Sequence, residues 1–250
     1  MKINKKLAKL MTEKPIKADV SITDNKLYLY GTVGDYWGGI TLDDVKYQVK
    51  NMEKTNLIVH IHSYGGDATE GVAIRNFLMD SFSNIDVVID GIAASSASII
   101  AMCGKTLTMP AGTTYMIHNP WAGIIGNRQD LLREAKALES LQQSYRNVYM
   151  ERFTGTEEEL MELMEEESWL TAEEAGELGF ATKVAEPTQE IVQEENSLLV
   201  ANLISKYAAK VEPKAEPKKA DAEPSVEDEI EKPKQNNLLM NFARVFSNFE

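Results

Sequence analysis

The stretch from Gly91 to Gly104 reads "GIAASSASIIAMCG" and follows the apolar run "IDVVID" of residues 85–90. A glycine, two alanines and two serines therefore separate two apolar segments, although buried serine hydroxyls cost free energy unless they are hydrogen-bonded. Small residues at a corner between a strand and a helix allow another group to approach the backbone closely. We expect such a corner here. The alternative explanation is close packing of the helix that follows.

The composition limits the class of protein. The 250 residues suffice for one large domain or two small ones, and 43% of them are hydrophobic, enough for a core. The formal net charge of −13 argues against nucleic acid as a partner, because phosphate binding requires a basic surface. The single cysteine, Cys103, supports neither a disulfide nor a thiolate zinc site.

The sequence shows no targeting signal. The N-terminus "MKINKKLAKL" is basic but lacks the apolar run of a signal peptide, and no segment is long and apolar enough to cross a bilayer. We therefore expect a cytoplasmic protein without a membrane partner.

Strand-like and helix-like patterns alternate from about residue 19 to residue 184. Apolar or β-branched runs predict strands at residues 26–31, 56–61, 85–89, 106–109 and 114–118. Amphipathic or apolar patterns predict helices at residues 41–52, with Thr41 as N-cap, and at residues 70–82 and 96–102. This alternation predicts an α/β fold with right-handed crossovers.

A long amphipathic helix is expected from Asn127 to Phe153, because apolar residues recur there at three- and four-residue steps. Two short helices should follow, each opened by a capping box: Thr156 with Glu159, and Thr171 with Glu174. Gly179 is the expected C-cap of the second.

The composition changes again towards the end. We expect an N-terminal segment (1–18), one folded domain (19–186), a helix within 187–210 and a disordered linker at 211–235, which is rich in Glu, Lys, Ala and Pro. The final residues, 236–250, have apolar side chains at helical spacing. They predict either an amphipathic docking helix or a weakly ordered tail.

The chain has three histidines, and a serine hydroxyl becomes a nucleophile when a histidine takes its proton. His60 and His62 share one face of a strand, but no third ligand adjoins them, so we expect no metal there. His118 ends the strand 114–118 and is followed by "NP", which stops a strand. A histidine at such a position can lie in a cleft.

Three segments occur in order: "HSYGGDATEG" (62–71), "GIAASSAS" (91–98) and "MIHNP" (116–120). Together they resemble the ClpP family of serine peptidases over residues 19–184. The resemblance implies a ClpP/crotonase-like spiral of β-α-β units, with the long helix as a protruding handle. Enoyl-CoA hydratases share that spiral, but they need carboxylates at the reacting carbon, and the pair of Ser95 and His118 argues against them.

The resemblance also implies the site. Ser95 matches the nucleophile and His118 the general base, while the backbone N–H groups of Gly66 and Ser96 match the oxyanion hole. No metal or cofactor is implied. "ESWLTAEEA" (167–175) matches the segment that begins with the family's aspartate, so the third position of the triad falls on Glu167. Alternatively, Glu167 belongs to a solvated acidic run.

Some features depart from the housekeeping members. Tyr64 and Asp67 flank the glycine pair where a proline and an apolar residue are usual. "YWGGIT" (36–41) and "ESWLTAEEA" look more like ClpP-like peptidases of tailed phages and prophages, which process the head during maturation. That resemblance implies a serine endopeptidase acting on capsid or scaffold proteins, in the bacterial cytoplasm or the phage procapsid.

The family resemblance also implies homo-oligomeric rings, often heptameric and stacked through the handle. Two alternatives stay open: a general ClpP proteolytic subunit working with an AAA+ unfoldase, and a non-enzymatic scaffold protein with a vestigial peptidase fold.

Overall fold

The computed structural model describes residues 5–35 and 38–185, all within the first of two units, 1–191 and 192–250. The helix, linker and docking segment expected between residues 187 and 250 lie outside the described residues. In chain order, the elements are α1 (Lys5–Glu13), β1 (Asp19–Thr23), β2 (Lys26–Val33), α2 (Leu42–Val49), β3 (Asn56–Gly66), α3 (Ala68–Ser81), β4 (Asn84–Ala94), α4 (Ser96–Ala101), β5 (Thr106–Pro110), β6 (Thr114–Ile117), α5 (Arg128–Met150), α6 (Glu157–Glu165), β7 (Ser168–Thr171), α7 (Ala172–Glu177) and β8 (Lys183–Ala185).

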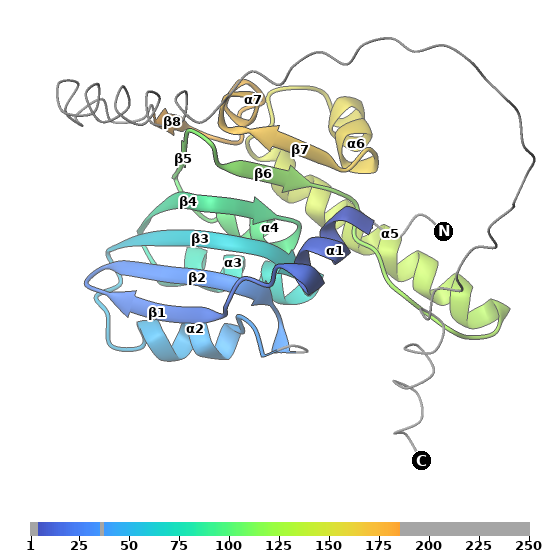
Figure 1. The fold of residues 1–250 in the computed structure, drawn as a ribbon, viewed down its shortest axis with the longest axis horizontal. Coiled ribbons are helices and arrows are strands. Elements are labelled where there is room, and N and C mark those ends of the chain that lie inside the picture. Colours follow the sequence, from blue (N-terminus) through green and yellow to red (C-terminus); the bar gives the residue numbers. More distant parts are fainter. Residues whose placement is uncertain (1–4, 36–37, 186–250) are drawn as a thin grey trace, which may run out of the picture. The chain divides into compact units, whose positions relative to one another are not determined.

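The eight strands form one mixed sheet with the order β1-β2-β3-β4-β5-β8 (Figure 1). The strands from β2 to β5, and β8, pair in parallel, while β1 joins its edge antiparallel to β2. Strand β6 leaves this order: it pairs in parallel with the end of β4 and antiparallel with β7. The predicted α/β class and all five expected strands are confirmed.

The main core lies between one face of the sheet and helices α2, α3 and α4 (Figure 1). Alternate residues of each central strand are buried there, as the pattern of β3 shows, because successive side chains of a strand point to opposite faces. The end of α5 closes this core with Tyr145, Val148 and Tyr149.

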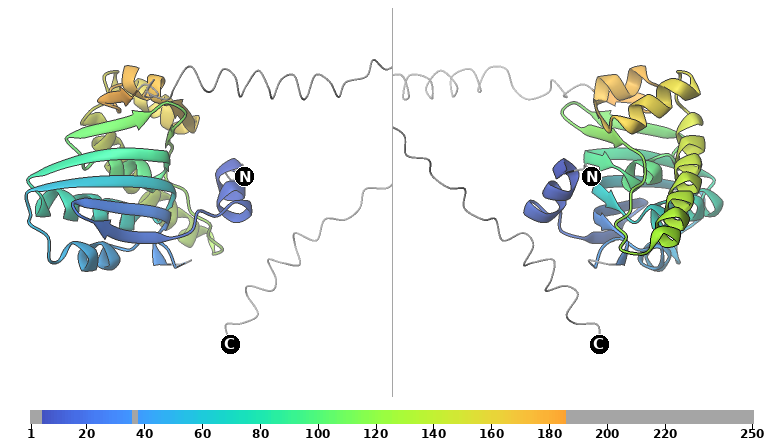
Figure 2. Two further views of the ribbon diagram at one scale, coloured as in Figure 1. Left: turned by 60° about the vertical axis from the view of Figure 1, so that its left-hand side comes forward. Right: turned by 90° about the vertical axis from the view of Figure 1, so that its right-hand side faces the viewer.

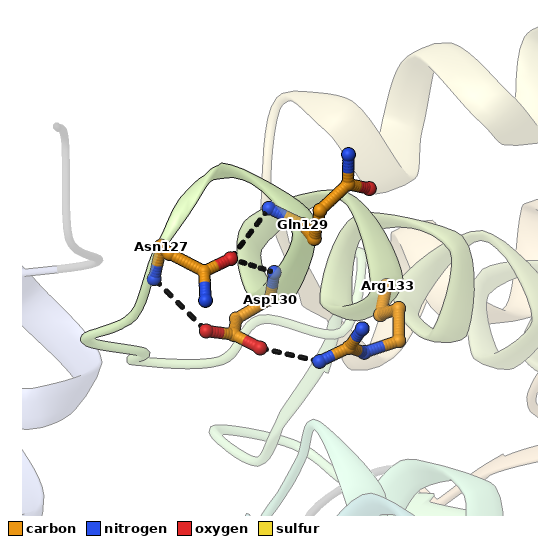
Figure 3. Close-up of polar contacts among 4 residues, drawn as sticks. All are labelled: Asn127, Gln129, Asp130 and Arg133. Atoms are coloured by element: carbon orange, nitrogen blue, oxygen red, sulfur yellow. Dashed lines mark hydrogen bonds and ion pairs between the residues drawn. The ribbon is translucent and has the colours of Figure 1, made fainter.

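Helix α5 begins at a capping box (Figure 3). The Asn127 side chain accepts hydrogen bonds from the backbone N–H groups of Gln129 and Asp130, and the Asp130 carboxylate accepts one from the Asn127 N–H and pairs with Arg133. These bonds use N–H groups that have no partner within the helix. The expected capping boxes at Thr156 and Thr171 are also present, and Gly179 follows the C-cap of α7 with φ +86°.

Helix α1 was not expected from the sequence. It lies beside the carboxyl ends of the central strands (Figures 1 and 2). Leu7, which is 3% exposed, fixes it there by packing on Ile92, Ala94 and Met116. This second cluster is separate from the main core, since Ala94 and Met116 point to the opposite face from Ala93 and Tyr115. None of the helices within residues 5–35 and 38–185 is long and apolar enough to cross a membrane.

Candidate active site

Strand β4 changes its pairing partner along its length, and this change determines where the candidate site forms. Residues 86–88 of β4 pair with β5, whereas its last residues, 92–94, pair with β6. Ala94 lies opposite Met116, and the next residue, Ser95, continues the ladder by donating its N–H to the Met116 carbonyl at 3.0 Å. The ends of these two strands therefore bring Ser95 and His118 together.

Ser95 occupies a sharp corner between β4 and α4. Its backbone has φ 56° and ψ −127°, a conformation that non-glycine residues rarely adopt. Such a conformation persists only where surrounding bonds fix it, and it recurs at active sites. Here the N–H of Ser95 is bonded to β6, and its carbonyl accepts from the N–H of Ser98 at 2.9 Å. The expected corner is therefore present, and its turning residue is Ser95.

The side chains of Ser95 and His118 are in contact. Ser95 Oγ lies 2.7 Å from His118 Nε2, and the two residues are only 9% and 5% exposed. Burial lowers the pKa of His118 to about 4, so its ring is neutral near pH 7. When the Ser95 hydroxyl donates to Nε2, the ring proton is on Nδ1. This is the protonation state in which a histidine can accept a proton from a serine.

Glu167 lies near this pair but does not bond to it. In the antiparallel ladder the last pair is Ile117 with Ser168, and His118 and Glu167 are the residues that adjoin this pair. Glu167 has φ 60°, and its carboxylate accepts from Trp169 Nε1 at 3.4 Å. Between these two described residues there is no hydrogen bond, so the expected contact between Glu167 and the histidine is not made.

The glycine pair lies against the start of α4, beside Ser95, and the Gly65 N–H donates to Ser63 Oγ at 3.0 Å. Ser96 is the first residue of α4, so its N–H has no partner within that helix. A Cβ on Gly65 would lie 2.9 Å from the Ser96 nitrogen, and a Cβ on Gly66 would lie 2.0 Å from the Val33 carbonyl oxygen. Neither position therefore accommodates a side chain, and Gly66 lines the same cleft as Ser95 and His118.

That cleft has a volume of about 830 Å³. Leu7, Met11 and Ile16 line it on the side of α1, and Leu138, Leu141 and Tyr145 of α5 also line it. A space of this size, mainly apolar and with a few polar groups at one point, is typical of a binding site. The contribution of α1 was missed because nothing in residues 1–18 signals where they pack.

The other two histidines lie away from the cleft lining. His60 Nδ1 is 2.9 Å from an Asp90 carboxylate oxygen, and Tyr30 OH donates to the same carboxylate at 2.6 Å. Across the described part of the chain, no three His, Cys, Asp or Glu side chains are grouped closely enough to hold a metal ion. Cys103 is buried, and burial raises its thiol pKa to about 12.

Comparison with known proteins identifies the protein family. Residues 21–188 match the family model described as Clp protease. The chain belongs to the Clp protease family. The "ATP-dependent Clp protease proteolytic subunit 2" of Tropheryma whipplei is 29% identical over 160 residues, which cover 59% of this chain and 88% of that subunit. The "ATP-dependent Clp protease proteolytic subunit" of Chlorella vulgaris is 30% identical over 144 residues, which cover 56% of this chain and 71% of that subunit.

A solved structure agrees in fold. The structure of a ClpP1 point mutant from Listeria monocytogenes matches with a TM-score of 0.57 at 21% identity, covering 66% of this chain and 92% of that one. At that identity the likeness shows the fold alone. The Clp protease fold inferred from the three sequence segments is thus confirmed.

The buried His118 of this Clp-family chain should make folding stability depend on pH. Its folded pKa of about 4 lies below the ordinary value of 6.5, so the unfolded chain binds the proton first as the pH falls. The free energy of unfolding should therefore decrease by about 3 kcal/mol between pH 6.5 and pH 4 on account of this group. Urea unfolding of the parent and of His118→Gln over this range measures the effect. Parallel curves for the two proteins would contradict it.

Proposed function

We propose that this chain is a serine endopeptidase in which Ser95 is the nucleophile and His118 the general base. The observation that carries the proposal is the 2.7 Å contact between Ser95 Oγ and a buried, neutral His118 Nε2. His118 accepts the hydroxyl proton as Ser95 Oγ attacks the carbonyl carbon of a peptide bond. It then donates this proton to the leaving amine, and a water molecule hydrolyses the acyl-enzyme by the same steps.

The negative charge on the substrate oxygen is stabilised by the backbone N–H groups of Gly66 and Ser96. The start of α4 at Ser96 and the bare backbone at the glycine pair support this assignment. N–H groups that are already oriented before the charge develops stabilise a transition state without reorganising. The absence of side chains at Gly65 and Gly66 allows this backbone to lie close to Ser96 and to Val33.

Glu167 is the third member of the triad. A change in its side-chain conformation brings its carboxylate to His118 Nδ1, since His118 and Glu167 adjoin the last residue pair of the ladder between β6 and β7. Its carboxylate then orients the ring and stabilises the imidazolium that forms during attack. The competing interpretation, a solvated acidic run, assigns no function to Glu167.

Covalent labelling tests the triad. A fluorophosphonate probe should label the parent at Ser95, and Ser95→Ala and His118→Ala should abolish labelling, because one lacks the nucleophile and the other the base. Glu167→Gln should lower peptide hydrolysis by roughly 10²–10⁴-fold, since an amide cannot balance the imidazolium charge. Glu166→Gln is the matched control, because Glu166 is exposed in the same acidic run. No labelling of a folded, assembled parent would favour a vestigial peptidase.

The substrates are polypeptides, and we favour capsid or scaffold proteins processed during phage head maturation. The support is the resemblance of residues 36–41 and 167–175 to phage-type members. The second candidate, a general proteolytic subunit served by an AAA+ unfoldase, is favoured by the relatives, which are named ATP-dependent Clp protease subunits. Both candidates act in the bacterial cytoplasm, and the first also inside the procapsid.

Dependence on nucleotide separates these two candidates. In the maturation role, the purified chain should cut a co-expressed capsid protein of the same genome into fragments of defined size without ATP or an added ATPase. Gel analysis and mass spectrometry follow the cleavage, with Ser95→Ala as the control. Cleavage that appears only with an unfoldase and ATP would favour the general subunit.

We further propose that the chain assembles into rings of identical subunits, stacked through α5 as the handle. The support is exposed apolar surface in and just before the start of α5. Ile125, in the segment before α5, is 83% exposed. Trp121 in the same segment, and Leu131 and Leu132 in the first turns of α5, are about half exposed. Exposed apolar side chains gathered in one region are typical of an interface.

Charge in this region should disrupt the assembly. Leu131→Glu combined with Leu132→Glu should lower the mass measured by analytical ultracentrifugation, because carboxylates would then be buried at the interface. Lys136→Glu, an exposed site further along α5, is the control. An unchanged mass for the double variant would exclude this surface as the stacking contact.

A further inference from the structure

A buried chain of hydroxyl groups connects α5 to the carbonyl of Ser95. Ser98 Oγ donates to the Ser95 carbonyl oxygen at 2.6 Å, and Tyr149 OH lies 2.7 Å from Ser98 Oγ. The Ser98 hydroxyl has a single proton, which it donates to Ser95, so Tyr149 is the donor in the second bond. The Tyr149 phenol of α5 thereby orients the Ser98 hydroxyl, which in turn bonds to the carbonyl of Ser95 at the corner.

All the hydroxyl groups of this hydrogen-bonded series are fully buried. Ser98, Tyr149 and Tyr115 each have 0% exposure, and Tyr115 OH donates to the Ser98 backbone carbonyl at 2.7 Å. Burial raises the pKa of the Tyr149 phenol well above its ordinary value, so the phenol keeps its proton. Buried hydroxyls cost free energy unless they are bonded, and each of these has a partner.

We propose that Ser98 and Tyr149 are positioning residues for the nucleophile, an inference that rests on the peptidase function proposed above. The carbonyl to which this hydroxyl series bonds belongs to Ser95. Ser95 has the rare backbone conformation, φ 56°, and its side chain contacts His118. A rotation of the peptide group at Ser95 moves Oγ relative to the imidazole. The hydroxyl chain opposes that rotation.

An ordinary structural role is the competing explanation, because serine side chains near helix ends often bond to a carbonyl three residues earlier. Such a role affects the stability of the fold but not the rate of chemistry at Ser95. The two roles can be separated because the hydroxyl pair can be removed singly or together. Removing one hydroxyl leaves the other buried without a full set of partners, whereas removing both does not.

The experiment compares Ser98→Ala, Tyr149→Phe and the double variant with the parent. Two quantities are measured for each full-length protein: the rate of fluorophosphonate labelling of Ser95, followed by intact mass, and the midpoint of thermal unfolding. Thr113→Ala is the matched control, since Thr113 Oγ1 also donates to a carbonyl three residues earlier, Pro110 O, at 2.7 Å and is 7% exposed. Thr113 lies in the turn between β5 and β6, outside the residues that line the cleft.

We expect Ser98→Ala to slow labelling about tenfold to a hundredfold, as small misplacements of a reacting group do. Tyr149→Phe should have a smaller effect, because Ser98 Oγ still donates to Ser95. The double variant should regain part of the thermal midpoint lost by Ser98→Ala while its labelling stays slow. Thr113→Ala should lower the midpoint but label at the parental rate.

Two results overturn the inference while leaving the peptidase proposal intact. One is a parental labelling rate in Ser98→Ala. The other is labelling that recovers together with the thermal midpoint in the double variant. If the folded parent itself is not labelled at Ser95, the peptidase proposal fails, and the positioning role fails with it.

Discussion

The pairing of the last residues of β4 with β6 is the constraint on which the site depends. Ala94 lies opposite Met116, and the Ser95 N–H extends this ladder by one more bond. Because side chains alternate along a strand, a slip of one residue would turn β6 over and direct His118 away from the serine. The apolar side chains of β6 oppose such a slip, since Tyr115 and Ile117 point into the main core and Met116 into the cluster beneath α1.

The small residues of the Gly91–Gly104 stretch allow close packing at the corner between β4 and α4. Ala93 and Ala97 are fully buried in the main core and admit α4 close to the sheet. Two glycines that face Ser95 and Ser96 are equally constrained: a Cβ on Gly71 would lie 2.8 Å from Ser96 Cβ, and one on Gly65 would lie 2.8 Å from Ser95 Cβ. Close packing, one of the two explanations of this stretch, is therefore confirmed, and the expected corner is present at Ser95. Close packing therefore fixes the corner at which Ser95 lies.

Elements with local signals were predicted from the sequence, and those decided by distant contacts were not. The capping boxes at Thr156 and Thr171 depend on residues three apart, and α5 has a long amphipathic repeat, so both could be read directly. Helix α1 could not, because its place is decided by Leu7 packing on strands more than eighty residues later in the chain. The Glu167 side chain is a similar case: its place in the triad segment follows from the motif, but its hydrogen bond depends on Trp169.

The electrostatics of the site explain why a third group is needed in the proposed mechanism. Burial lowers the pKa of His118 because its charged form loses hydration and, in this conformation, gains no bond from the Glu167 carboxylate. A neutral ring suits the resting state, since the base is ready at any pH near neutrality. The same burial opposes the imidazolium that must form when Ser95 attacks, and this cost falls on the transition state. A carboxylate that approaches only as the charge develops removes the cost without protonating the ring beforehand. Glu167 adjoins the last residue pair of the ladder between β6 and β7 and bonds to Trp169 in this structure, and it is the residue that we propose for this role.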